Sequence, residues 1–270
     1  YLLTLTDISG IFTYNYMIIE PTELTLTQLA SSKLALNCAG DKDGVINIEV
    51  NGGTPQYTLS WTGPDIPHVV TNPYGVSDLG KGLYRVDITD ANKCYVSRSF
   101  QITEPDTLLL SANVGLNTCN GDANGTITLV VNGGTPAYIY KWTGIGVDEY
   151  VQNQSSLIGG RYTLRITDQN LCKIDTAFVI NNPASLQANI TGISDICEGD
   201  QVTLYMVSSG VAPWTFVYTD GLNDYTLVSD RPDTSVVVKP LIDTEYSLVS
   251  VEDGMGCEAK LSGKVSVTVH

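Results

Sequence analysis

The six cysteines are the residues whose type and spacing most directly suggest chemistry. They fall two to each of three related stretches: Cys38 and Cys94, Cys119 and Cys172, Cys197 and Cys257. No two are at Cys-x-x-Cys spacing, which argues against zinc. The even count favours disulfides over the alternative of six buried free thiols. We predict three disulfides, one within each stretch as just paired, and hence an oxidising compartment outside the cytoplasm.

Catalytic chemistry has little support among the other side chains. The chain holds two histidines, His68 and His270, and no Ser-His-Asp or Cys-His arrangement can be assembled around either. His68 falls in the stretch Pro-Asp-Ile-Pro-His-Val, and we interpret it as a solvated loop residue. The 29 Asp and Glu residues allow many carboxylate pairs, but none lies in a motif with acid–base character. We therefore expect no enzyme activity and no cofactor.

Two acidic turns have the spacing of a partial calcium site. Asp41 and Asp43 lie in Asp-Lys-Asp-Gly, and Asp122 lies in the matching Asp-Ala-Asn-Gly. A complete EF-hand loop would continue to a glutamate at about position twelve, which this chain lacks. We interpret both stretches as Asx turns before strands, with calcium at Asp41 and Asp43 as the open alternative. Asp90 and Asp168 are likewise interpreted as polar turn formers that precede a cysteine.

The cysteines belong to a motif that recurs at a nearly fixed interval. Its first two copies are offset by 119 − 38 = 81 residues at the first cysteine and by 172 − 94 = 78 residues at the second. A unit of about 80 residues has the size of a small β-sandwich and is longer than a solenoid repeat. Asn-Gly-Gly-Thr-Pro occurs at residues 51–55 and 132–136. Because Asn and Gly tolerate positive φ, each predicts a tight connection between two strands.

Strands must position these turns and cysteines. Apolar and polar residues alternate through Ile46, Ile48 and Val50, and the alternation recurs at 127–131 and 202–206. No long segment shows the apolar period of a helix. We therefore predict an all-β chain of tandem immunoglobulin-like β-sandwich repeats, with one disulfide in each complete repeat.

The repeat boundaries predict four units joined nearly end to end. These are residues 1–21, 22–105, 106–183 and 184–270. Glu-Pro or Asn-Pro ends each of the first three, and proline stiffens short linkers. Residues 1–7 match residues 84–90, so we expect 1–21 to be the last two strands of a preceding copy, and the chain to be a fragment of a longer protein.

Several aromatic residues recur at matched positions. Tyr84, Tyr162 and Tyr246 each begin a late strand, as in the tyrosine corner of Greek-key sandwiches, where the hydroxyl ties down the backbone of the corner. A role in ligand binding is the alternative for these three. Trp61 and Trp142 are expected to cover a disulfide or close the edge of the core. The loop after each Trp varies between copies, and its aromatic residue, Tyr74 or Tyr150, is either an ordinary loop aromatic or a contact for sugar rings.

Composition narrows the classes of partner. Lys and Arg number 14 and Asp and Glu 29, so the formal net charge is −15. A nucleic-acid backbone would be repelled by this charge. No run of eighteen apolar residues occurs that would predict a membrane span.

The complete motif resembles the SprB repeat of large Bacteroidota surface proteins. It comprises Cys-x-Gly-Asp or Cys-Asn-Gly-Asp, then Asn-Gly-Gly-Thr-Pro-x-Tyr, Trp-Thr-Gly and Gly-x-Tyr ending in Ile-Thr-Asp before a second cysteine. The resemblance covers residues 22–183, with 1–21 as a tail. Residues 184–270 lack Gly-Gly-Thr-Pro and the Thr-Asp ending before the second cysteine, and are predicted to form a divergent immunoglobulin-like domain.

The resemblance implies a location and a function. It implies type IX secretion across the outer membrane, display at the cell surface as a long adhesin filament, and a role in attachment and gliding motility. The partners it implies are neighbouring repeats of the same chain, an extracellular surface or polysaccharide, and gliding or secretion machinery at the outer membrane. The alternatives are a polysaccharide-binding module, or accessory domains of a secreted polysaccharide-degrading enzyme. Thr107 and Thr176 resemble the O-glycosylated threonines of exported Bacteroidota proteins, which predicts glycans there.

Overall fold

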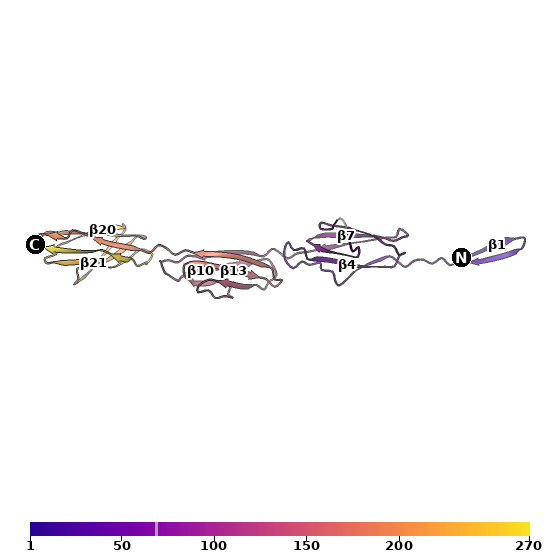
Figure 1. The fold of residues 1–270 in the computed structure, drawn as a ribbon, viewed down its shortest axis with the longest axis horizontal. Helices are drawn as coiled ribbons and strands as arrows, with labels where there is room; N and C mark the ends of the chain where they lie inside the picture. The colour runs from indigo at the N-terminus through magenta and orange to yellow at the C-terminus, as the bar shows by residue number, and fades with distance from the viewer. Residues whose placement is uncertain (68–69) are drawn as a thin grey trace. The chain divides into compact units, whose positions relative to one another are not determined.

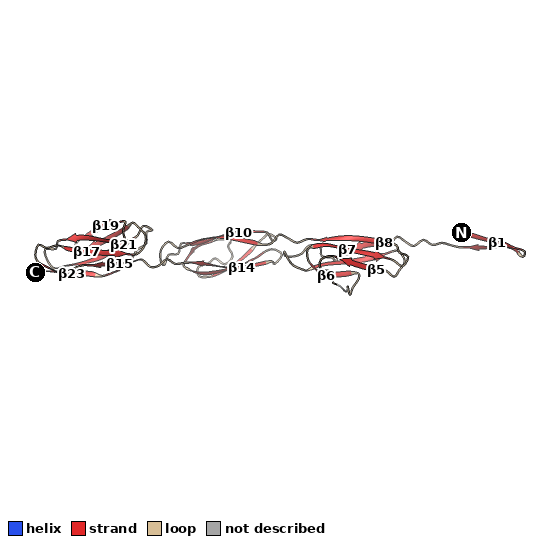
Figure 2. Ribbon diagram, turned by 90° about the horizontal axis from the view of Figure 1, so that it is seen from above, coloured by secondary structure: helices blue, strands red, loops and turns tan. Residues whose placement is uncertain are grey.

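The computed structural model describes residues 1–67 and 70–270 of the chain. Strands, turns and loops make up all of these residues (Figure 2), which confirms the predicted all-β class. No helix in the described part of the chain is long and apolar enough to cross a membrane. We call residues 22–105, 106–183 and 184–270 the first, second and third copy.

The molecule divides into two compact units. The first contains residues 1–109, 132–138 and 167–173, and the second contains residues 110–131, 139–166 and 174–270. The division passes through the second copy, because two of its turns belong to the first unit. One of these turns carries Cys172 and the other is the Asn-Gly-Gly-Thr-Pro connection.

The first copy is a sandwich of two antiparallel sheets, in which Figure 1 labels β4 and β7. One sheet has the order β3-β4-β6 and the other β5-β7-β8. The bounds are β3 Thr25–Gln28, β4 Gly44–Asn51, β5 Thr58–Thr62, β6 Gly75–Leu79, β7 Gly82–Thr89 and β8 Tyr95–Ile102. The predicted alternation places Ile46 and Ile48 of β4 in one core with Val86 and Ile88 of β7. A single apolar core between two sheets is what defines a sandwich.

The second copy repeats this topology. Its sheets have the orders β9-β10-β12 and β11-β13-β14, so each strand has a counterpart in the first copy. The bounds are β9 Leu109–Gly115, β10 Gly125–Asn132, β11 Ile139–Thr143, β12 Gln154–Leu157, β13 Gly160–Thr167 and β14 Lys173–Ile180. Ile127 and Leu129 of β10 and Leu164 and Ile166 of β13 are buried, as the alternation predicts.

The third copy is also two-layered but has larger sheets. One has the order β20-β17-β15-β22 and the other β16-β23-β21-β18-β19. The bounds are β15 Gln187–Thr191, β16 Asp195–Ile196, β17 Val202–Ser208, β18 Trp214–Thr219, β19 Asp224–Ser229, β20 Asp233–Val238, β21 Thr244–Glu252, β22 Lys260–Ser262 and β23 Lys264–Val269. Two pairings, β15 with β22 and β16 with β23, are parallel. These parallel pairs agree with the divergent sequence of this copy.

Residues 1–21 contain one antiparallel hairpin. Its strands are β1 Leu2–Asp7 and β2 Gly10–Asn15, and every side chain on them is exposed. The predicted pair of strands is therefore present. Their assignment to a preceding copy stays a prediction.

The tyrosine corner is confirmed in the first two copies. The hydroxyl of Tyr84 donates to the carbonyl of Gly80 at 3.0 Å, and that of Tyr162 donates to the carbonyl of Ile158 at 2.8 Å. Both rings are buried, and so is Tyr246 in the third copy. The glycine of Trp-Thr-Gly serves this packing, because a Cβ at Gly63 would lie 2.3 Å from the Tyr84 ring.

The two predicted tryptophans close the core edge. Trp61 donates from Nε1 to the carbonyl of Pro73 at 2.8 Å and packs against Phe100, while Trp142 donates to the carbonyl of Val151 at 2.9 Å. Both are buried in the apolar cores of their copies. These contacts match the core-edge interpretation rather than a cover over a disulfide.

Replacing Tyr84 with phenylalanine should lower the free energy of unfolding by about 1.5 kcal/mol, because the Gly80 carbonyl and the Asp65 carboxylate lose their shared hydroxyl donor. Urea denaturation of the whole chain measures the change. Tyr74→Phe is the matched control, since Tyr74 is 42% exposed. Equal stability of the two variants would contradict the corner's contribution.

Asp65 should make stability depend on acid pH. Lys42 first, then the Gly80 amide and the Tyr84 hydroxyl, lower the pKa of Asp65 from 3.8 to about 2. The carboxylate therefore stabilises the fold fully above pH 3.8, and this contribution is lost as the pH falls from 3.8 toward 2. In Asp65→Asn the urea midpoint should fall less than in the native chain when the pH is lowered from about 6 to about 2. Asp230→Asn, at an exposed aspartate, should leave the decrease unchanged.

Candidate functional site: the cysteine junctions

The cysteines join successive copies, contrary to the predicted pairing. Cys38 of the first copy bonds to Cys172 of the second, and Cys119 of the second bonds to Cys257 of the third. The pairs Cys38–Cys94, Cys119–Cys172 and Cys197–Cys257 predicted from sequence are therefore wrong. Cys94 and Cys197 are free and exposed, so the expectation of one disulfide within each repeat is wrong as well.

Strand β8 explains why Cys38 and Cys94 cannot pair. Cys94 immediately precedes β8, which spans eight residues. The Cys38 segment lies at the other end of β8, because the Leu36 amide donates to the Thr103 carbonyl at 2.9 Å. Eight residues of strand extend about 25 Å. A disulfide needs Cα atoms within about 7 Å.

The second copy has the same separation. Cys172 immediately precedes β14, whereas the loop that carries Cys119 reaches the other end of that strand. There the Asn120 side-chain amide donates to the Pro183 carbonyl at 2.7 Å. The first and second copies therefore each have their first cysteine at one end of the sandwich and their second at the opposite end.

The first cysteine of each copy lies in a Cys-x-x-Asp turn. The aspartate amide donates to the cysteine carbonyl at 3.2 Å for Asp41 and Cys38 and at 3.2 Å for Asp122 and Cys119. In return, the aspartate carboxylate accepts from the cysteine amide at 3.1 Å and 2.9 Å respectively. These reciprocal bonds make both stretches turns, as predicted, but not Asx turns, because each carboxylate accepts from an amide three residues before it rather than two residues after it.

The contacts of Asp41 and Asp43 bear on the alternative that these two carboxylates bind calcium. Asp41 accepts from the Cys38 amide, and Asp43 forms an ion pair with Lys33. Within residues 1–67 and 70–270 no cluster of three His, Cys, Asp or Glu side chains is arranged to hold a metal ion. The structure thus gives both carboxylates structural partners.

The second cysteine of each copy lies in an Asp-x-x-x-Cys turn built on a buried carboxylate. Asp168 accepts from the amides of Cys172 at 2.8 Å, Asn170 at 2.9 Å and Thr135 at 2.7 Å. It therefore ties the cysteine turn to the Asn-Gly-Gly-Thr-Pro turn. Only glycine fits beside it, because a Cβ at Gly134 would lie 2.7 Å from its carboxylate oxygen.

The same carboxylate recurs in the other copies. Asp90 accepts from the amides of Cys94 at 2.8 Å and Thr54 at 2.8 Å. These bonds, that of Thr54 first, hold the pKa of Asp90 below its ordinary value. Asp253 accepts from Cys257 at 3.1 Å. Asp90 and Asp168 thus do more than form turns, as they position the cysteine.

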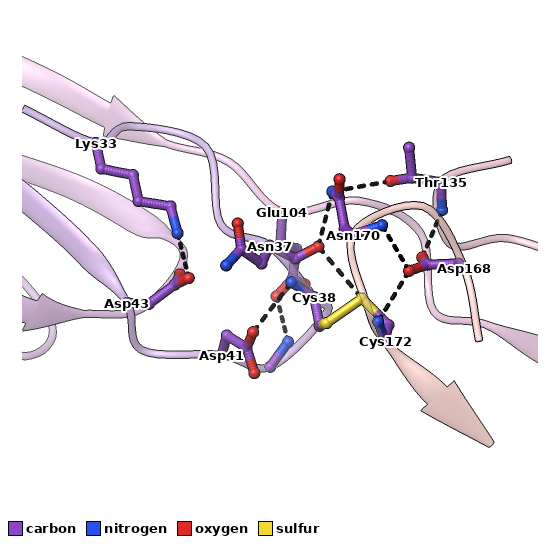
Figure 3. Close-up of a disulfide and its surroundings, with 11 residues drawn as sticks. Lys33, Asn37, Cys38, Asp41, Asp43, Glu104, Thr135, Asp168, Asn170 and Cys172 are labelled. Carbon is purple, nitrogen blue, oxygen red and sulfur yellow. Dashed lines mark hydrogen bonds and ion pairs between the residues drawn. A yellow bond between two sulfur atoms is a disulfide. The ribbon is translucent and has the colours of Figure 1, made fainter. Parts of the chain in front are cut away.

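Figure 3 shows the junction that contains Cys38 and Cys172, whose Cα atoms lie 5.6 Å apart. The side-chain amide of Asn170 donates to the Asn37 carbonyl at 3.1 Å and to the Thr135 hydroxyl at 3.0 Å. Sγ of Cys172 lies 3.4 Å from the Asn37 carbonyl oxygen, a close contact without a hydrogen because this sulfur is bonded to sulfur. A hydrogen bond between side chain and backbone thus accompanies the covalent one.

Glu104 supports the Cys38 side of this junction. Its carboxylate accepts from the Gly40 amide at 2.8 Å and pairs with Lys81 at 3.2 Å. These contacts, that with Gly40 first, hold the pKa of Glu104 below its ordinary value. The Glu-Pro that ends the first copy therefore braces the turn that carries its first cysteine.

The second disulfide lies in a surface hollow within the second unit. The Cα atoms of Cys119 and Cys257 are 5.4 Å apart. The hollow is lined by both cysteines, by residues 183–186 of the connecting segment, by turn residues 209–211, and by Asp253, Met255 and Gly256. Sγ of Cys257 lies 3.6 Å from the Thr118 carbonyl oxygen, as Cys172 does from that of Asn37.

The remaining predicted site residues have separate positions. His68 lies outside the described residues, and Nε2 of His270 lies 3.5 Å from the Asp195 carboxylate. Tyr74 and Tyr150 are exposed, at 42% and 63%, and sugar contact through them stays a prediction. Thr107 is exposed and Thr176 is half-buried on β14. Glycans on these threonines also stay a prediction.

Comparison with known proteins gives one family. A sequence profile described as SprB repeat matches residues 36–65 and 117–147, which contain the first cysteine, the Asn-Gly-Gly-Thr-Pro turn and the following strand of two successive copies. Two segments of the chain therefore match the SprB repeat. The predicted family resemblance is confirmed for these two segments. No curated protein matches the chain.

Solved structures resemble the chain only distantly. Sidekick-1 immunoglobulin domains 1–5 align over 92% of this chain at 10% identity and a TM-score of 0.38. The ectodomain of mouse nectin-like molecule 4 aligns over 78% of this chain and 81% of its own length, at 14% identity and a TM-score of 0.31. The chain spans 60% of the length of the Sidekick-1 segment.

Proposed function

We propose that this segment is a non-catalytic repeat region of a long secreted adhesin at the cell surface, serving attachment and gliding motility. The SprB repeats support this class of protein. The observation that carries the proposal is the crossing of each boundary between copies by two covalent connections. One is the peptide linker, and the other is Cys38–Cys172 or Cys119–Cys257.

This double connection suits a chain that carries load outside the cell. A β-sandwich under tension separates by breaking hydrogen bonds between strands, which individually contribute about 1 kcal/mol. A disulfide across the boundary adds a covalent path beside the linker. It also keeps neighbouring copies together when an extracellular protease cuts that linker. Such disulfides persist in the oxidising space where an adhesin works.

The charge of the chain is compatible with this role. The formal net charge of −15 keeps long polypeptides apart and in solution. In this proposal the segment lies outside the membrane, as part of a surface filament.

Cutting the first linker tests the double connection. We would insert a site for a sequence-specific protease between Pro105 and Asp106 and cleave the folded chain. Without reductant the two pieces should migrate together, and with reductant they should separate. Cys172→Ser carrying the same insertion is the control, and its pieces should separate in both conditions. If the two pieces of the cleaved chain that retains Cys172 separate without reductant, the proposal is contradicted.

Labelling of cells tests the location and the role. Beads coated with antibodies against residues 22–183 should bind intact cells that express the parent protein, and on a gliding species they should travel. Labelling of lysed cells alone would overturn the surface location. Beads that bind without moving on a gliding species would remove the motility role and leave the adhesin.

A further inference from the structure

We propose that Cys94 and Cys197 are the two open positions of a continuing disulfide chain. Cys94 bonds to the first cysteine of a SprB copy that precedes the first copy, and Cys197 bonds to the second cysteine of a copy that follows the third. The two disulfides in the structure obey one rule, which is that the first cysteine of each copy joins the second cysteine of the next. Cys94 and Cys197 are the cysteines for which this rule names a partner outside residues 1–270.

The turn of Cys94 has the same geometry as the bonded turn of Cys172. The Cys94 amide donates to Asp90 at 2.8 Å and the Cys172 amide donates to Asp168 at 2.8 Å. The aspartate amide donates back to the cysteine carbonyl at 3.0 Å in both. The Cys94 turn therefore has this geometry although Cys94 is not bonded to a second cysteine.

Asn92 extends this match to the contacting side chain. Asn92 donates to the Thr54 hydroxyl at 2.7 Å, as Asn170 donates to the Thr135 hydroxyl at 3.0 Å. In the bonded junction Asn170 also donates to the Asn37 carbonyl beside the partner cysteine. Asn92 thus holds the position from which a preceding copy would be contacted.

Cys197 lies in a Cys-x-x-Asp turn that matches the bonded turn of Cys119. The Asp200 amide donates to the Cys197 carbonyl at 3.0 Å, as Asp122 does to Cys119 at 3.2 Å. Cys197 also borders a surface hollow with Ile193, which is 61% exposed. Cys119 lines a hollow together with the Cys257 turn of the next copy. The exposed apolar residue and the hollow beside Cys197 fit such a turn.

Partners at the separations of the two bonded pairs would lie outside residues 1–270. The bonded cysteines are 134 and 138 residues apart. A partner of Cys94 at such a separation would precede residue 1, and a partner of Cys197 would lie near 197 + 134 = 331, beyond residue 270. We propose that both partners belong to neighbouring copies in the same polypeptide, because a tethered neighbour has an effective concentration of about millimolar.

Formation of each disulfide needs an oxidant, and a small-molecule disulfide can act as one. The two cysteine S–H bonds break and one S–S bond forms, with release of two protons and two electrons. The disulfide of the oxidant accepts both and becomes two thiols. Oxidised glutathione is the probe used below.

A chain extended by one copy tests the inference. We would replace residues 1–21 with a duplicate of residues 22–105, so that the chain has eight cysteines (six plus the two of the duplicate). After oxidation by glutathione and alkylation without reduction, two thiols should react, as in the original chain. Peptide mapping should show Cys94 bonded to the duplicate of Cys38. The reactive thiols should be Cys197 and the duplicate of Cys94.

Two further measurements keep the outcome decisive. Alkylated Cys94 in an extended chain that retains Cys38–Cys172 would overturn the inference. Multimers linked through Cys94 on a non-reducing gel would overturn the choice of a neighbouring copy in favour of a second molecule. If the duplicate does not fold, a chain with residues 106–183 appended after His270 gives the second test. There Cys197 should bond to the duplicate of Cys172, and free Cys197 would overturn the inference.

Discussion

Cys38→Ser should raise the number of reactive thiols from two to three and lower the free energy of unfolding by about 5 kcal/mol. The disulfide closes a loop across 134 residues of sequence. Without it the unfolded chain gains the entropy of that open loop, and the Asn170 contact loses its covalent support. Thiol titration and urea denaturation of the whole chain measure the two effects.

Cys94→Ser is the matched control for this substitution. Cys94 is free and exposed, so its replacement should remove one reactive thiol and leave stability unchanged. If Cys94→Ser destabilises the chain and exposes Cys38 to alkylation, the two residues are bonded in solution. That result would restore the pairing within the copy.

Asp168→Ala should lower the free energy of unfolding by about 4 kcal/mol. The carboxylate is 1% exposed and accepts from three backbone amides, of Thr135, Asn170 and Cys172. Hydrogen bonds to a charged group contribute about 1.5–3 kcal/mol each, and the partly buried amides would lose their acceptor. The turn that positions Cys172 should loosen, so this disulfide should be reduced faster by dithiothreitol.

Asp230→Ala provides the comparison for Asp168→Ala. Asp230 is exposed, and its removal should change stability by less than about 0.5 kcal/mol and leave the rate of reduction unchanged. Equal stability of the two variants would show that the buried carboxylate does not hold the cysteine turn.

The strands, turns and corners could be predicted from sequence because their causes are local. Alternation at Ile46 and Ile48 depends only on which face of one strand is buried. The Asn-Gly-Gly turns need positive φ, and Gly52 and Gly133 have it, at 74° and 71°. The tyrosine corner links residues four positions apart. Each feature is set within a few residues of the motif that predicts it.

The disulfide pairing could not be obtained from matched motif positions alone, because it depends on which end of the sandwich each cysteine occupies. When strand direction is ignored, the two cysteines of one copy look like the two halves of one disulfide. Strand β8 begins at Tyr95, directly after Cys94, and carries the chain to Thr103 beside the Cys38 segment. Following that direction along the sequence would have placed the pair at opposite ends.

The sequence contains a further signal for the turns that carry the second cysteines. Aspartate precedes the second cysteine by four residues in every copy, as Asp90, Asp168 and Asp253. The third of these was missed because Thr-Asp is absent there, yet Asp253 is buried and accepts from the Cys257 amide. By contrast, Asn37 and Asn170 carry no such signal, because their contact forms only when two copies meet.

Peptide mapping of the folded chain without reduction tests the central claim most directly. The chain would be alkylated, digested and analysed for pairs of peptides joined by a disulfide. We expect Cys38 joined to Cys172, Cys119 joined to Cys257, and alkyl groups on Cys94 and Cys197. Peptides that join Cys38 to Cys94, or Cys119 to Cys172, would contradict the account of disulfides that connect successive copies.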